Sequence, residues 1–188
     1  VISRSFRSDG DLEGRLSSSS GAEGTAILEI VHDIAPGAQL MFANFETGLA
    51  FNAAVNFLAA NSDVVIDYIG FFGGPYDQTS NVSSNTAAEL NRTANPIRGY
   101  YTSVGNQAQR HYQELYVESG IDGLPLVGQA GNFHLFQATG DTTDCLDLDL
   151  RVANLLLLSP GDTAVITLNW DDTFGAATTN YDLFILDN

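Results

Sequence analysis

The stretch GAEGTAILEIVHDIAPGAQL, residues 21–40, decides how the N-terminal half of the chain folds. Apolar residues recur at near-helical spacing from Ile27 to Ile34, and a Pro-Gly pair at residues 36–37 stops the run. The pattern predicts an amphipathic helix over residues 24–34. Glu23 stands at the start of this helix, where the exposed amides and the positive dipole end of the first turn favour a carboxylate. Taken alone, this position indicates a helix cap.

Strands and helices alternate on both sides of this stretch. The predicted strands are VISRSF at residues 1–6, AQLMFAN at 38–44, DVVIDYIGFF at 63–72 and RGYYTSVGN at 98–106. Between them, the spacing of apolar residues predicts helices at 24–34, at 49–60 and, in SSNTAAELNRTAN, at 83–95. Such alternation is typical of a parallel sheet flanked by helices. We therefore expect an α/β domain over residues 1–125.

The second part of the chain has a different pattern of predicted secondary structure. After a Gly-rich stretch, strand-like segments follow one another: NFHLFQA, CLDLDLRV, DTAVITLNW and YDLFILD. In the second of them, leucines at 146, 148 and 150 alternate with aspartates at 147 and 149, which places leucines on one face and carboxylates on the other. This pattern predicts a small antiparallel, jelly-roll-like β-sandwich over residues 126–188.

Composition excludes several classes of function. Seven Lys and Arg against 23 Asp and Glu give a formal charge of −16, which repels nucleic acid. No apolar run approaches the roughly 20 residues that would span a bilayer, so we expect no membrane insertion. The single Cys145 excludes an internal disulfide and a cysteine zinc site. An acidic chain with so few basic residues makes a calcium site worth seeking.

Three of these segments together resemble the subtilisin-like serine peptidase (subtilase) family in their order and spacing. VISRSF is similar to the first core strand, EGTAILEIVHDIAPGAQL to the helix that carries the catalytic His, and YYTSVGNQ to the strand that ends in the oxyanion Asn. GNQAQRHYQ and NWDDTFGAATTNYDLFILD resemble the β-sandwich inserts of large secreted bacterial subtilase-like proteins. The resemblance implies a truncated subtilisin-like fold, and a secreted, extracellular or cell-surface location.

The residues at the family's catalytic positions do not form a triad. Arg4 stands at the position of the catalytic Asp and Glu23 at that of the His, while Asn106 matches the oxyanion Asn. A serine triad needs an imidazole base and a carboxylate that orients it, and arginine provides neither. No segment within residues 141–188 resembles the turn that carries the family's nucleophile. The resemblance therefore implies a pseudopeptidase with degenerate triad positions and a vestigial oxyanion residue.

The related sedolisin family uses Glu in place of His, together with a second carboxylate one helical turn later. From Glu23 that position is Ile27, so the pair is absent. We interpret Arg4 and Glu23 as a structural ion pair that replaces the former contact between Asp and His.

Two further groups of residues are candidate binding sites. The aromatic residues Tyr68, Phe71, Phe72 and Tyr76 follow a predicted strand at the carboxyl edge, where open α/β sheets bind ligands. They fit either the remnant of a peptide groove or the closure of a core edge. Oxygen-bearing side chains also flank two predicted strands and suit Ca²⁺, or else cap turns: Asp171, Asp172, Asn180 and Asp182. His32, His111 and His134 are scattered without zinc-site spacing.

These observations leave two hypotheses for function. The first is a catalytically inactive subtilase-like module that acts as a structural or binding unit of a secreted bacterial surface or extracellular protein. The second is a fragment of an active secreted serine endopeptidase whose nucleophile lies outside this chain. Under the first hypothesis, exposed sheet edges would allow self-association into a homo-oligomer or polymer, because unpaired strands are templates for pairing.

Overall fold

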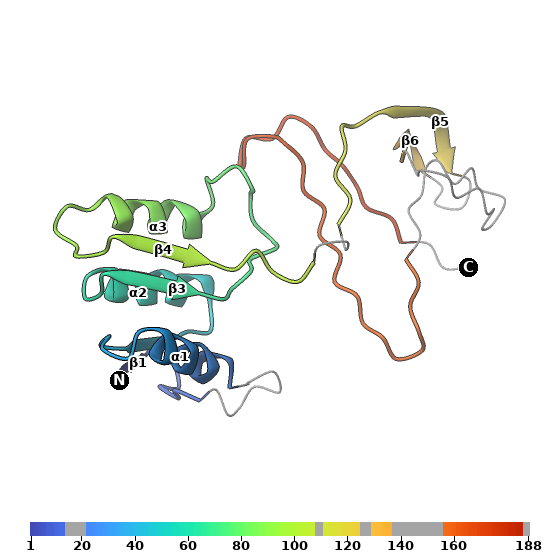
Figure 1. The fold of residues 1–188 in the computed structure, drawn as a ribbon. Coiled ribbons are helices and arrows are strands. Elements are labelled where there is room, and N and C mark those ends of the chain that lie inside the picture. Colours follow the sequence, from blue (N-terminus) through green and yellow to red (C-terminus); the bar gives the residue numbers. More distant parts are fainter. Residues whose placement is uncertain (14–21, 108–110, 125–128, 137–155, 186–188) are drawn as a thin grey trace. The chain divides into compact units, whose positions relative to one another are not determined.

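The computed structural model describes residues 1–13, 22–107, 111–124, 129–136 and 156–185 (Figure 1). Two compact units divide the chain. The first comprises Val1–Asn106 and Asn169–Thr178, and the second comprises Gln107–Leu168 and Thr179–Asn188. Within the described residues the protein is mixed α/β, with three helices and short parallel sheets.

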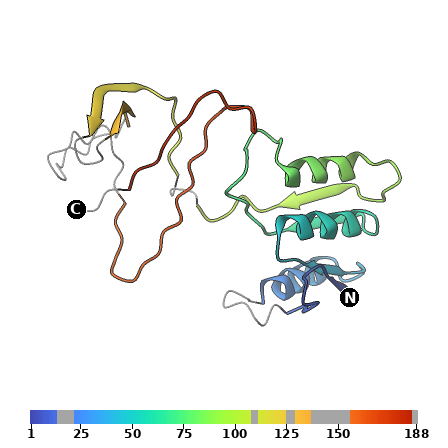
Figure 2. The ribbon, with the colours of Figure 1, turned by 180° about the vertical axis from the view of Figure 1, so that it is seen from behind.

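The first unit alternates strands and helices as the sequence predicts. Its elements are β1 (Ile2–Ser5), α1 (Glu23–Ile34), β2 (Met41–Asn44), α2 (Gly48–Ala59), β3 (Val64–Asp67), α3 (Asn81–Asn91) and β4 (Gly99–Thr102). The strands pair in parallel, β1 with β2 and β3 with β4, as two two-stranded sheets. Figure 2 shows the same elements from behind. The predicted parallel pairing is therefore confirmed.

Helix α2 packs against α3, β2 and β3. It begins after Thr47, whose hydroxyl oxygen accepts a hydrogen bond from the Ala50 amide at 3.1 Å. This is the usual way in which a threonine satisfies a free amide of the first turn. The face that α2 buries carries Phe51, Asn52, Ala54, Val55 and Ala59. A small core forms where Ala59 meets Val65 of β3 and Ile97.

Helix α1 begins at Glu23, so the interpretation of this residue as the cap is wrong. The capping position belongs to Ala22, which has no side chain able to accept a hydrogen bond from the first turn. Glu23 is exposed in that first turn, where its charge still complements the helix dipole. The glycine that follows has a packing role, because a Cβ on Gly24 would lie 2.5 Å from the Phe42 ring of β2.

Strand β3 is shorter than the apolar run DVVIDYIGFF predicts. It ends at Asp67, whose carboxylate accepts a hydrogen bond from the Ile69 amide at 3.1 Å. An aspartate that binds the amide two residues later forms a turn, which competes with strand pairing. The residues that follow leave the sheet as a loop. This carries the aromatic segment of residues 68–76 away from the strand.

The second unit contains a hairpin of β5 (Glu118–Leu124) and β6 (Gln129–His134), paired antiparallel with register shifts. The predicted strands at 162–170 and 181–187 have no strand pairing within the described residues 156–185. The backbone there forms tight-turn hydrogen bonds instead, from Asp162 to Ser159 and from Ala176 to Thr173. The segment CLDLDLRV lies outside the described residues. The β-sandwich is therefore not confirmed.

Candidate functional site

Arg4 lies in β1 and is used for packing. Its guanidinium carbon lies 4.9 Å from the centre of the Phe6 ring and 5.0 Å from that of Phe57 on α2. The two rings also pack against each other, with centroids 5.8 Å apart. A guanidinium at this distance is attracted by the electron-rich faces of aromatic rings. The side chain at the position matched to the catalytic Asp therefore joins β1 to α2.

The predicted ion pair between Arg4 and Glu23 is absent from the described residues, where ion pairs join Arg7 to Asp9 and Arg92 to Glu89. The physical reason is that the Arg4 guanidinium lies over two rings, while Glu23 starts α1 as an exposed residue. The prediction of a pair was therefore wrong.

The segment that follows β1 is bound to the carboxyl end of β2. The Asp11 carbonyl accepts hydrogen bonds from the Asn44 side-chain amide at 2.7 Å and from the Ser5 hydroxyl at 3.3 Å. Arg7 binds Asp9 through two nitrogens, and these hydrogen bonds lower the pKa of that carboxyl to about 2. This segment is thus held by local hydrogen bonds beside the strand that carries Arg4.

The carboxyl ends of β3 and β4 meet at Asp67. Its carboxylate accepts hydrogen bonds from the Tyr100 hydroxyl and, at 2.6 Å, from the Thr102 hydroxyl. Burial and the neighbouring Asp67 both raise the pKa of Tyr100. The phenol therefore stays protonated and acts as a donor. Because Asp67 also binds the Ile69 amide, it links both strands to the loop that follows β3.

Tyr68 and Asn106 were predicted as members of different sites, and the structure brings them together. The Asn106 side-chain amide donates to the Tyr68 hydroxyl at 3.4 Å. Gly105 precedes this residue with a φ of +76°, a left-handed conformation that glycine adopts readily. The side chain at the position matched to the oxyanion Asn therefore has a partner within the first unit.

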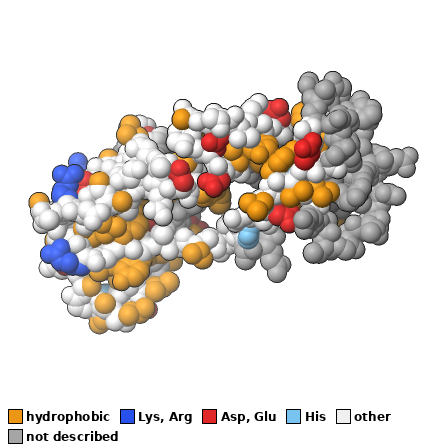
Figure 3. All heavy atoms as spheres, turned by 90° about the horizontal axis from the view of Figure 1, so that it is seen from above, with side chains coloured by type: hydrophobic (Ala, Val, Ile, Leu, Met, Phe, Trp, Pro, Cys, Tyr) orange, Lys and Arg blue, Asp and Glu red, His pale blue; other side chains and the backbone are white. Residues whose placement is uncertain are grey.

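The aromatic residues after β3 have different surroundings. Phe71 packs edge-on against the buried Phe51 at 5.1 Å, and Phe51 packs in the same way against Phe45 at 4.9 Å. Phe71 thus closes a core edge, as one of the two interpretations predicted. Phe72 and Tyr76 are 48% and 66% exposed, and the Tyr76 hydroxyl donates to the Phe72 carbonyl at 3.4 Å. Hydrophobic side chains reach the surface elsewhere too (Figure 3).

The loop before α3 contains a residue that sequence reasoning missed. Gln78 has a φ of +71°, a left-handed conformation that is unfavourable for a residue with a Cβ. Its neighbours hold it, because Asp77 accepts hydrogen bonds from the Thr79 amide and hydroxyl at 2.9 and 2.5 Å. These bonds lower the pKa of Asp77. Glutamine carries no sequence signal for this conformation, since glycine or asparagine would be expected there.

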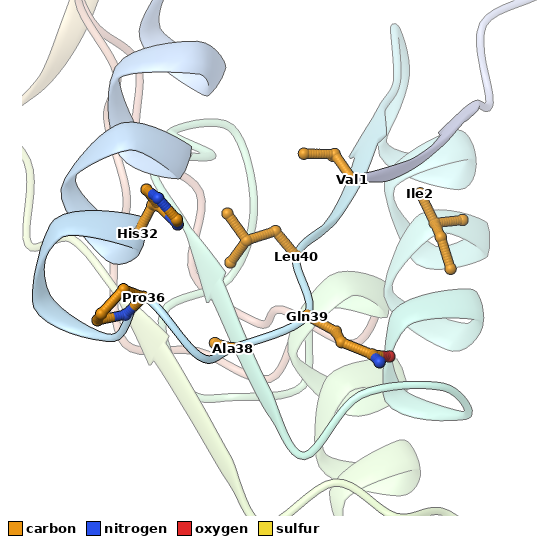
Figure 4. Close-up of a pocket in the computed structure, with 7 residues that line it drawn as sticks. All are labelled: Val1, Ile2, His32, Pro36, Ala38, Gln39 and Leu40. Carbon is orange, nitrogen blue, oxygen red and sulfur yellow. The ribbon is translucent and has the colours of Figure 1, made fainter.

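A hollow of about 560 Å³ lies beside the amino ends of β1 and β2, where these strands begin. Figure 4 shows His32 on α1, Val1 before β1 and Leu40 before β2 around it. Ile2, Pro36, Ala38 and Gln39 complete its lining. None of the predicted site residues lines this hollow. It is therefore separate from the carboxyl ends of β3 and β4, where the sequence placed a binding site.

The four predicted calcium ligands fall in different units, Asp171 and Asp172 in the first, Asn180 and Asp182 in the second. Both carboxylate oxygens of Asp172 accept backbone hydrogen bonds, from Thr173 at 3.1 Å and from Thr178 at 2.7 Å. This is the turn geometry that was the alternative interpretation. In the part of the chain that the structure describes, no three His, Cys, Asp or Glu side chains are grouped as a metal site requires.

The described residues also contain no helix that is long and apolar enough to cross a membrane. Comparisons with known protein families, with curated proteins and with solved structures found no match.

Proposed function

We propose that the chain is a catalytically inactive, subtilase-like module that serves as a structural or binding unit of a secreted bacterial surface or extracellular protein. The observation that supports this proposal best is the position of Arg4 over Phe6 and Phe57. An arginine cannot hold an imidazole as a carboxylate does, and here its guanidinium lies over two aromatic rings. At this position the side chain contributes to the fold and not to chemistry.

The partner of Asn106 supports the same proposal. An oxyanion donor must point at the oxygen on which charge develops, at hydrogen-bond distance. The Asn106 amide instead donates to the Tyr68 hydroxyl. Arg4 and Asn106, at two of the matched positions, thus both have intramolecular partners.

The proposal includes the finer architecture that the resemblance implies, a truncated subtilisin-like domain followed by a β-sandwich over residues 126–188. The parallel pairs β1–β2 and β3–β4 agree with the first part. Short two-stranded sheets have unpaired edges, and such edges favour pairing with another chain. Self-association into a homo-oligomer or polymer is therefore part of the proposal.

Hydrolysis of casein and of a small ester tests the inactive assignment. We expect no turnover from the protein, from Glu23→Gln, or from Glu29→Gln, a matched change of another exposed carboxylate on α1. Turnover in the original chain that disappears in Glu23→Gln but persists in Glu29→Gln would overturn the proposal. That outcome would show that this chain carries its own catalytic groups, with Glu23 among them.

A further inference from the structure

His134 lies at the end of β6 within a group of aromatic rings. Tyr116 stacks on the imidazole at 5.5 Å between ring centres, and Phe136 meets it edge-on at 4.7 Å. Tyr112 lies at 5.9 Å and also contacts Phe136. These residues and the segment 111–117 all belong to the second unit. The ring is therefore held on several sides by neighbours of defined geometry.

Both nitrogens of this imidazole have hydrogen-bond partners, and the partners define the tautomer. The Val117 backbone amide donates to Nδ1 at 3.2 Å, so Nδ1 must be the nitrogen without a proton. Nε2 then carries the proton and lies 3.0 Å from the Tyr112 hydroxyl, which in turn donates to Glu114. The chain of donors thus runs from His134 through Tyr112 to a carboxylate.

We propose that His134 is a pH-sensitive latch that holds the start of the β5–β6 hairpin only while the imidazole is neutral. A proton taken up from solvent can bind only at Nδ1, since Nε2 is already protonated. Nδ1–H and the Val117 N–H would then be two donors facing each other. The bond between them is lost, and Val117 must move away from the ring.

The position of Val117 explains why this bond matters for the hairpin. Its carbonyl accepts a hydrogen bond from the Leu135 amide at 2.7 Å, directly before β5 begins at Glu118. Glu118 is also the register partner of His134. Displacing Val117 therefore loosens the first contact between the two strands.

The other titratable groups around the ring are carboxylates and tyrosines. Glu118 lies opposite His134 in the sheet, and Glu114 is linked to it through Tyr112. Tyr116 packs on the ring and on Tyr181. Burial, followed by Glu118 and Tyr181, raises the pKa of Tyr116, which therefore stays neutral. Carboxylates and aromatic faces both attract an imidazolium.

NMR spectroscopy of the whole chain tests the latch near pH 8 and near pH 5, on either side of the usual imidazole pKa of about 6.5. At the higher pH, the ¹⁵N shifts of His134 should show a bare Nδ1 and a protonated Nε2. At the lower pH, the hydrogen-exchange protection factor of the Val117 amide should fall roughly five- to tenfold, as expected for the loss of one hydrogen bond. A proton on Nδ1 near pH 8, or an equal protection factor at both pH values, would overturn the proposal.

His134→Asn provides the matched variant, because an asparagine oxygen can replace Nδ1 as the acceptor but does not titrate. The Val117 protection factor should then be independent of pH. His111→Asn, a change of an exposed histidine in the same unit, should retain the pH dependence of the original chain. If the Val117 protection factor of His134→Asn still fell between pH 8 and pH 5, a group other than His134 would cause the effect and the proposal would be wrong. If this variant does not fold, the His134 tautomer measured in the original chain near pH 8 tests the proposal.

Discussion

At the scale of single residues, two charged side chains have defined partners. Arg4 lies over two rings, and Glu89 is a buried carboxylate. The contact between Arg4 and Phe57 joins residues far apart in the sequence, so no local pattern predicts it. That Arg4 cannot act as a catalytic base stays a prediction from residue type alone. Sequence reasoning gave Arg4 the wrong partner, because partner choice depends on how β1 and α2 pack.

Replacing Arg4 should therefore affect stability. Arg4→Gln removes the attraction between guanidinium and rings and should lower the free energy of unfolding by about 1 kcal/mol. Arg4→Lys keeps the charge but loses the flat group that stacks on rings, so an intermediate loss is expected. Urea denaturation of the three proteins checks this order. Equal stability of all three would show that the contact contributes nothing.

Glu89 predicts a pH dependence of stability. Arg92 and Asn95 donate to its carboxylate, and these bonds lower its pKa. A carboxyl whose pKa is lower when folded stabilises the fold above its unfolded pKa of about 4.3, and this stabilisation is lost as the pH falls through the folded pKa. Glu89→Gln should reduce the free energy of unfolding near pH 7 by about 1–2 kcal/mol. The variant's free energy of unfolding should also decrease less steeply as the pH falls.

The matched control is Glu29→Gln, which changes an exposed carboxylate of α1 and should leave the acid profile unchanged. Thermal melts from about pH 7 to pH 3 span the relevant range, because ordinary carboxyl groups titrate within it. A Glu89→Gln profile parallel to that of the original chain would contradict the assignment.

At the scale of elements, sequence patterns predicted those helix starts that depend on nearby residues. Helices α1 and α2 each begin one residue before the expected start, because the helical spacing of apolar residues is a local signal. Strand β3 ends early because Asp67 binds the chain that follows it, a competition that an apolar run conceals. The strand-like segments at 162–170 and 181–187 could not be settled in this way, since a strand requires a distant partner.

The close approach of α1 and β2 gives a prediction at this scale. An added methyl group on Gly24 would overlap the Phe42 ring, so Gly24→Ala should destabilise the first unit by about 1–3 kcal/mol. Gly37→Ala is the control, because a Cβ there has no heavy atom within 4 Å. That change should be neutral or slightly stabilising. Chemical denaturation compares the two variants, and equal effects would mean that α1 does not depend on this contact.

At the scale of the whole molecule, the excess of negative charge leads to the calcium hypothesis. The formal charge of −16 favours binding of divalent cations, and the ligands that the sequence predicts are Asp171, Asp172, Asn180 and Asp182. A cation that binds only the folded state stabilises it by about 2.7 kcal/mol at a hundredfold excess over its dissociation constant. The melting temperature should therefore be higher in millimolar Ca²⁺ than in EDTA.

Two variants make this test specific. Asp182→Ala should abolish most of the difference between the two buffers, whereas Asp33→Ala, an exposed acid of α1, should preserve it. Identical melting temperatures of the original chain in both buffers would remove the site. The role of Asp172 would then be to stabilise a turn, through the hydrogen bonds that its carboxylate accepts from the Thr173 and Thr178 amides.

Covalent labelling tests the proposal that this chain is a subtilase-like module without the family's chemistry. A fluorophosphonate reacts only with a serine activated by a base, and Arg4 and Glu23 provide no such system. The folded chain is incubated with the probe beside an active serine peptidase, and its intact mass is measured. We expect an unchanged mass. One adduct per chain on a single serine, absent after heat denaturation, would contradict the proposal.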